Sequence, residues 1–162
     1  MMKLRPLTLL LLWMIVLPLQ AANDRPASVP EEAKWVNVDR VVDGDTIVLM
    51  DKTRVRLHGI DTPERDQPYG KQATSALDAL IKTEVFVEEK DTDRYWRLVG
   101  VLYTPEGLNV SLEMVCSGHA WWYERYAKFD SDLEDCQESA QETSLGLWAD
   151  DDPVAPWAQR RK

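Results

Sequence analysis

Acidic side chains follow two short apolar runs in the first half of the chain. Asp45 lies in an Asp-Gly-Asp-Thr segment, and Asp61 and Glu64 lie in an Asp-Thr-Pro-Glu segment. Each segment begins where an expected strand ends, so we expect the carboxylates of both to face one cation. Oxygen ligands of this kind suit Ca²⁺ or Mg²⁺. Arg56 lies just upstream, and a guanidinium beside a carboxylate-bound cation is the partner that an anionic phosphodiester requires.

Each segment has an ordinary explanation when it is taken alone. Asp-Gly between β-branched runs is a strong hairpin signal, and most such turns bind nothing. Asp61 and Pro63 equally fit a common loop. A third segment, Asp91–Arg97, changes this interpretation because it reads Asp-Thr-Asp-Arg-Tyr-Trp-Arg and opens another apolar strand. The order and spacing of the three segments favour one shared site over three unrelated turns.

This ordered set of segments resembles the staphylococcal nuclease (thermonuclease) family, as a secreted bacterial member, over roughly residues 35–148. Tyr69-Gly70 and a closing Gly146-Leu147-Trp148 belong to the same pattern. The resemblance implies a calcium-dependent nuclease that cleaves DNA or RNA at the 5′-oxygen bond and leaves 3′-phosphate products. It further implies a residue for each role: calcium held by Asp45, Asp61 and the Thr62 backbone carbonyl, Glu64 as the base-side carboxylate, and Arg56 and Arg97 on the phosphate.

The resemblance is incomplete for residues that contact the nucleotide. Tyr95 and Tyr126 match substrate-side tyrosines, whereas Glu124 replaces another one. Arg94 is a further candidate because it can add to a local basic face beside the site. The long lysine-rich loop of the family is shortened to residues 65–68 here. The preference for DNA or RNA therefore stays open.

The histidines and the Trp-Trp-Tyr segment have competing interpretations. His58 has no second candidate ligand nearby, and an oxygen-rich cluster suits a hard cation that does not favour imidazole. We therefore expect a structural role for His58 and likewise for His119. Trp121–Tyr123 can stack on bases, but aromatic residues after a helix end in a small domain more often close the core.

Composition and segment order predict one domain preceded by an export signal. The chain has 162 residues, of which 44% are apolar, and this is enough for a single core. Lys3 and Arg5 precede an apolar run over residues 9–19 and two small alanines. That order is typical of a secretory signal peptide, with an uncleaved membrane anchor as the alternative. We expect a signal peptide at 1–22, a flexible segment at 23–34, the domain at 35–149 and a solvated tail at 150–162.

The charge balance limits the way in which nucleic acid can be bound. The net charge is −9, and removal of Lys3 and Arg5 takes it to about −11. Such a balance argues against tight non-specific binding of nucleic acid. It is compatible with catalysis, because a divalent ion and a few arginines can supply local positive charge. We expect an exported monomer, periplasmic or extracellular, with no stable protein partner and no membrane association after cleavage.

Hydrophobic periodicity predicts strands first, with one helix inserted and two appended. A three-strand meander is followed by an amphipathic helix and then by two more strands. This order is typical of a five-stranded OB-type barrel in an α+β fold. Two further helices follow, one closed by Gly118 and one opened by a Ser131-x-x-Glu134 capping box. The expected ranges are strands at 35–42, 46–50, 53–60, 84–88 and 96–103, and helices at 70–82, 109–117 and 131–146.

Arg56 and Asp61 can share one phosphate site only if the chain bends between them. In a regular strand, residues five positions apart lie on opposite faces and about 16 Å apart, at roughly 3.3 Å per residue. Gly59 is the expected position of a bulge or sharp bend. Strict alternation through Asp61 would exclude a shared site.

The chain contains two cysteines. Cys116 and Cys136 are expected to form a disulfide, because the count is even and the chain is expected in an oxidising compartment. Two buried free thiols are the alternative.

A non-catalytic OB-fold module that binds nucleic acid or protein is the main functional alternative. Such a module has no need of all five residues that the catalytic interpretation uses: Asp45, Arg56, Asp61, Glu64 and Arg97.

Overall fold

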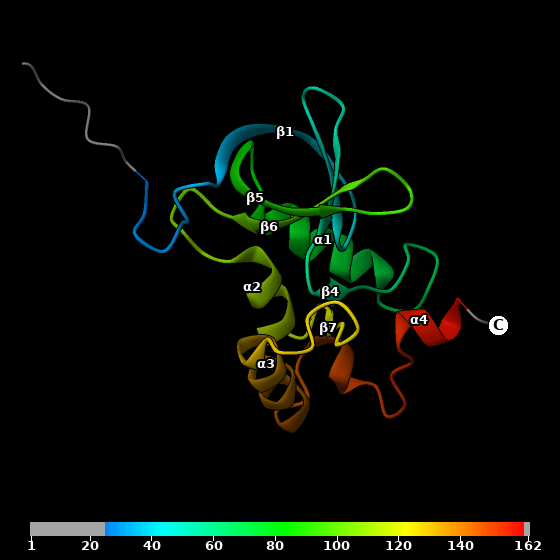
Figure 1. The fold of residues 1–162 in the computed structure, drawn as a ribbon. Coiled ribbons are helices and arrows are strands. Elements are labelled where there is room, and N and C mark those ends of the chain that lie inside the picture. Colours follow the sequence, from blue (N-terminus) through cyan, green and yellow to red (C-terminus); the bar gives the residue numbers. More distant parts are fainter. Residues whose placement is uncertain (1–24, 161–162) are drawn as a thin grey trace, which may run out of the picture.

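A computed structural model describes residues 25–160 of the chain. Its centre is a closed barrel of five strands in the order β1-β2-β3-β6-β5 (Figure 1). The pair β3–β6 is parallel, and the other described pairs of neighbouring strands are antiparallel. The predicted OB-type barrel is therefore confirmed. The strands are β1 Lys34–Asp43, β2 Thr46–Leu49, β3 Arg54–Leu57, β5 Glu84–Thr92 and β6 Leu98–Tyr103.

The barrel interior is filled by apolar side chains from its strands and from the helices that cover one end. Ile47, Val55 and Leu102 are fully buried there, together with Leu77 and Met114 from two helices. Burial of this apolar surface is the main term that holds the strands together. The barrel is thus a rigid support for the loops that leave its strands.

The third predicted strand is shorter than expected. Residues 53–60 were expected to form one strand, but β3 ends at Leu57 and a separate two-residue strand, β4 Ile60–Asp61, follows. Gly59 lies between them with φ +78°, in the left-handed region that glycine adopts most easily. β4 pairs with β7 Trp121–Trp122 outside the barrel. The predicted bend is present at Gly59.

Two helices, α1 and α2, lie against the barrel, and a third, α3, packs on α2; their ends differ slightly from the predicted ones. They are α1 Gly70–Leu80, α2 Val110–Cys116 and α3 Ser131–Glu142. The side chain of Asp130, rather than that of Ser131, caps α3 by accepting from the backbone N of Leu133. The expected continuation of α3 to Gly146 is wrong, because a separate short helix, η1 Gly146–Ala149, follows a turn. Cys116 and Cys136 are joined by a disulfide that ties α2 to α3.

Both ends of the described chain pack against the domain. A flexible segment was expected at 23–34, but Val29 and Ala33 are buried against Phe86 of β5. A solvated tail was expected after Ala149, but a one-turn helix, α4 Pro156–Gln159, lies beside the loop that leads into α1 (Figure 1). No helix within residues 25–160 is long and apolar enough to cross a membrane. The predicted signal peptide at 1–22 lies outside the described residues.

Candidate active site

One guanidinium connects the two carboxylates that were predicted to bind metal. Nη1 of Arg56 lies 2.9 Å from Oδ2 of Asp45, and Nη2 lies 3.0 Å from Oδ1 of Asp61. All three side chains are largely buried, Asp61 almost completely. Charge-assisted contacts of this kind are short and directional. The structure therefore brings Asp45, Arg56 and Asp61 into one site.

The bend at Gly59 explains how Arg56 and Asp61 meet. His58 still belongs to the barrel, because its backbone N donates to the carbonyl of Gly100 in β6 at 2.9 Å. After Gly59 the chain turns away to pair with β7, and Ile60 and Asp61 are both buried in succession. The alternation of a regular strand is thereby interrupted, and Asp61 turns back towards the side chain of Arg56.

The loop after Asp61 is fixed against the Asp-Gly-Asp-Thr turn. The backbone N and the hydroxyl of Thr62 donate to Oδ2 of Asp45, at 3.0 and 3.1 Å. A Cβ atom at Gly44 would lie 2.7 Å from the Thr62 hydroxyl oxygen, which is too close for a side chain. Gly44 is therefore required for this contact between two segments far apart in the sequence, and not only for the turn.

Arg97, the residue just before β6, reaches the same cluster. Its Nη1 donates to the Thr46 hydroxyl at 3.4 Å, and that hydroxyl donates to Oδ1 of Asp45 at 3.0 Å. Its Nε donates to Oδ2 of Asp93 at 2.8 Å. The second predicted phosphate arginine is thus one side chain away from the carboxylates and is held by an acidic partner of its own.

Glu64 lies at the edge of the cluster and is half exposed. Its backbone N donates to Oε1 of Gln67 at 2.9 Å, which folds the short 65–68 loop back on itself. Its carboxylate is paired with Arg160, and the same guanidinium contacts Oδ2 of Asp61. Sequence reasoning missed Arg160, since its position in the tail gave no signal of a contact with a residue nearly one hundred positions away.

The electrostatics of the site follow from the burial of like charges. Burial, and then the charge of Asp45, raise the pKa of Asp61 to about 6, although Arg56 and Arg160 oppose both effects. Burial, and then the neighbouring Asp45, also raise the pKa of Asp43 to about 6. Asp43 lies beside the cluster, and its Oδ1 accepts a hydrogen bond from the backbone N of Asp45 at 3.1 Å. A site that concentrates buried negative charge in this way favours a bound cation.

The carboxylates have the donor chemistry of a site for a hard cation. Asp45 and Asp61 both contact the guanidinium of Arg56, so a positive charge already lies between them. Within residues 25–160, no group of three or more His, Cys, Asp and Glu side chains is placed to hold a metal ion. The Thr62 carbonyl, an oxygen donor beside Asp61 in the chain, is suited to complete a hard-ligand set.

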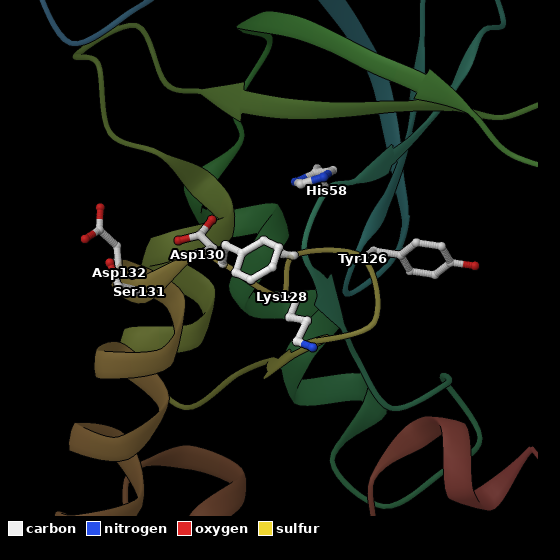
Figure 2. A pocket seen from close by; sticks show the side chains of 8 residues that line it. His58, Tyr126, Lys128, Asp130, Ser131 and Asp132 are labelled. Atoms are coloured by element: carbon white, nitrogen blue, oxygen red, sulfur yellow. The ribbon is translucent and has the colours of Figure 1, made fainter.

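The predicted substrate-side residues lie around this cluster without contacting the carboxylates. Arg94 donates to the Tyr95 hydroxyl at 2.7 Å, and both side chains are exposed. Tyr126 is also exposed and lines an open pocket of about 470 Å³. Figure 2 shows His58 on one side of this pocket and the loop with Tyr126 and Lys128 on the other. Among the hydrogen bonds of residues 25–160, none joins the His58 side chain to the carboxylates or arginines of the cluster, so its structural role stays a prediction.

Most of this chain is similar in sequence to known nucleases. The model of the staphylococcal nuclease homologue family matches residues 54–150. An uncharacterized endonuclease of Escherichia coli O157:H7 is 43% identical over 129 residues, 77% of this chain and 84% of that protein. The micrococcal nuclease of Shigella flexneri is 40% identical over 148 residues, 83% of this chain and 85% of that protein. The chain therefore belongs to the staphylococcal nuclease homologue family, a family of hydrolytic nucleases.

Proposed function

We propose that the protein is a calcium-dependent nuclease that hydrolyses phosphodiester bonds of DNA or RNA by attack of water. The observation that carries this proposal is the contact of Arg56 with both Asp45 and Asp61. It supports the proposal because a guanidinium, which suits a phosphate, lies beside two carboxylates that suit a divalent cation. The similarity to an endonuclease and a micrococcal nuclease supports nucleic acid as the substrate.

Each charged side chain has a distinct part in the proposed reaction. Asp45, Asp61 and the Thr62 carbonyl would hold calcium, which would supply positive charge next to one phosphoryl oxygen. Arg56 and Arg97 bind the remaining oxygens and offset the charge that grows on them as water attacks. Glu64 is half exposed, so water can reach its carboxylate, and it takes the proton of the attacking water. Cleavage of the bond between phosphorus and the 5′-oxygen would leave a 3′-phosphate on one product and, once the departing oxygen takes up a proton, a 5′-hydroxyl on the other.

The compartment and oligomeric state are part of the same proposal. An N-terminal basic and apolar segment followed by alanines supports export to the periplasm or the medium. The disulfide between Cys116 and Cys136 is in keeping with an oxidising compartment. We propose that the mature protein acts as a monomer.

Two substitutions separate catalysis from metal binding. Glu64→Gln removes the base but keeps the size of the side chain, so turnover of plasmid DNA or RNA should fall by about 10²–10⁴ at every calcium concentration. Asp45→Ala weakens the metal site, so part of its lost rate should return as calcium is raised. His58→Gln is the control and should stay within about tenfold of the unsubstituted protein. Full turnover in Glu64→Gln, or full turnover in excess chelator, would contradict the mechanism.

A further inference from the structure

The C-terminal helix α4 is docked on the strand that neighbours the active site. Trp157 stacks on Tyr123 with ring centroids 5.0 Å apart and meets Trp121 edge-on at 5.6 Å. Trp121 lies opposite Asp61 in the β4–β7 pair. Pro156 is buried at the first turn of the helix. Aromatic contacts of this kind give α4 a defined position although it has a single turn.

This position places Arg160 on two active-site carboxylates. Its guanidinium pairs with Oδ2 of Asp61 and with Oε1 of Glu64, the latter at 2.9 Å. Arg56 pairs with the other oxygen of Asp61. Both oxygens of the Asp61 carboxylate are therefore engaged by arginines, and the proposed base is engaged as well. A cation that binds Asp61 is therefore repelled by two guanidinium groups, and the repulsion falls if one of them moves away.

Arg160 is the easier of the two arginines to displace. Arg56 extends from a barrel strand and its side chain is 14% exposed, whereas Arg160 ends a one-turn helix and is 40% exposed. An ion pair that water can reach is weak and screened by salt. Release of α4 breaks no strand pairing, and within the helix it exposes mainly Pro156 and Trp157. The family model ends at residue 150 and does not include this segment.

We propose that α4 is a latch that competes with calcium, with Arg160 pairing Asp61 and Glu64 until the cation displaces it. This proposal rests on the proposed function, because it assigns a regulation to the same metal site. Calcium binding would free Glu64 for its part in catalysis and open the site to the substrate phosphate. The latch thereby raises the calcium concentration that half-fills the site above the concentration that the carboxylates alone would require.

Calcium affinity measured by isothermal titration calorimetry tests the latch without an activity assay. The protein without its N-terminal 22 residues is compared with Arg160→Ala and Trp157→Ala. Arg160→Ala should bind calcium about five- to tenfold more tightly, because it removes a competing charge. Trp157→Ala should act in the same direction by a smaller factor, because it loosens α4 and leaves the arginine in place. Arg40→Ala is the charge-matched control on β1 and should leave calcium affinity unchanged.

Hydrogen exchange supplies a second readout. Saturating calcium should increase exchange at the backbone amides of residues 157–160 and leave β2 and β3 protected. Unchanged or weaker calcium affinity in Arg160→Ala, or equal protection of α4 with and without calcium, would overturn the latch. Neither result would change the loss of turnover expected for Glu64→Gln, so the proposed function would still stand. Failure of every variant to bind calcium would overturn both the latch and the calcium assignment.

An independent observation concerns Trp96 in the turn between β5 and β6. Its backbone has φ +61°, and its side chain is 89% exposed. A bulky residue in the left-handed region is strained, and an indole in water gains no packing that offsets the strain. Asp93 holds the turn, since its backbone carbonyl accepts from the N of Trp96 at 3.0 Å. Glycine would fit this backbone better than tryptophan.

We infer that Trp96 stacks on an unpaired base of the nucleic-acid substrate, an inference that also rests on the proposed function. The next residue is Arg97, which reaches the cluster through Thr46. On the other side of Trp96 is Tyr95. The centre of the Tyr95 ring lies 4.8 Å from the guanidinium carbon of Arg94 and 5.6 Å from that of Arg97. Exposed aromatic rings next to arginines are the combination that binds single strands.

Trp96→Gly separates stability from binding because it should weaken binding without lowering stability. Binding is measured by anisotropy of a labelled single-stranded oligonucleotide and of its duplex, with Glu64→Gln in all proteins to prevent cleavage. Single-strand affinity should fall about tenfold and duplex affinity less than threefold, while the unfolding midpoint stays the same or rises. Met50→Ala, another exposed apolar side chain, is the control. Unchanged single-strand affinity, or equal weakening for both substrates, would exclude base stacking and leave the assignment of Glu64 intact.

Discussion

The Nε atom of Arg97 donates to Oδ2 of Asp93 at 2.8 Å, four residues earlier in the chain. The other oxygen of Asp93 accepts from the backbone N of Tyr95 and of Arg97, at 2.8 and 3.0 Å. One carboxylate therefore fixes both the turn and the direction of the guanidinium. Asp93 is a positioning residue for the proposed phosphate contact.

Substitutions of this pair should differ in size and in kind. Arg97→Lys keeps the charge but loses the planar fork, so we expect kcat to fall by about 10²–10³. Asp93→Asn keeps Arg97 but loosens it, so we expect a smaller loss of about tenfold. Steady-state kinetics on single-stranded DNA at saturating calcium measures both. An Asp93→Asn enzyme as impaired as Arg97→Lys would assign Asp93 a direct part in the reaction.

The pH dependence of stability has a source away from the metal site. His119 is half-buried, and its Nδ1 lies 3.0 Å from the hydroxyl oxygen of Tyr69. Burial lowers the pKa of His119 below its usual 6.5. The unfolded chain therefore takes up a proton at a higher pH than the folded protein does, and the free energy of unfolding falls as the pH drops below about 6.5.

His119→Gln isolates this contribution, because glutamine does not titrate. In urea unfolding between pH 5 and pH 7, with chelator present throughout, the free energy of unfolding should fall less on acidification in the variant than in the unsubstituted protein. His58→Gln is the matched comparison, since burial also lowers the pKa of His58. Profiles for His119→Gln that run parallel to those of the unsubstituted protein would show that the His119 pKa is not displaced by folding.

Local patterns in the sequence were enough to predict the barrel and most of the cluster. The bend at Gly59 was predicted because Arg56 and Asp61 could not otherwise meet, and this reason depends only on the spacing of residues along a strand. The contact of Arg160 with Asp61 spans 99 positions and has no local pattern. Three consecutive aspartates at 150–152 favoured a solvated tail, although Trp157 beyond them packs on β7.

The disulfide should contribute stability rather than activity. Cys116 and Cys136 lie 20 positions apart and join α2 to α3. A bridge over a loop of this length contributes roughly 3 kcal/mol. Replacing both cysteines by serine should lower the free energy of unfolding by about that amount and leave kcat of the folded protein within about twofold. Reaction of the unfolded, unreduced protein with two equivalents of a thiol reagent would show that the bridge does not form.

Gly59 should be the position where backbone strain most directly damages the site. An alanine Cβ there would lie 2.8 Å from a methyl carbon of Leu133, and φ +78° is unfavourable for alanine. We expect Gly59→Ala to lower the free energy of unfolding by about 2 kcal/mol. We also expect it to weaken calcium binding, because the same bend turns Asp61 towards Arg56.

Gly107→Ala is the matched control for Gly59→Ala. Gly107 has φ +89° and lies against Ser28 and Pro26, in a turn that forms no contact with the carboxylate cluster. Its substitution should cost comparable stability in urea unfolding and leave calcium affinity unchanged in calorimetry. If both alanine variants lost stability and neither lost calcium affinity, the bend at Gly59 would be a requirement of the fold alone. Weaker calcium binding in Gly59→Ala only would tie the bend to the geometry of Asp61.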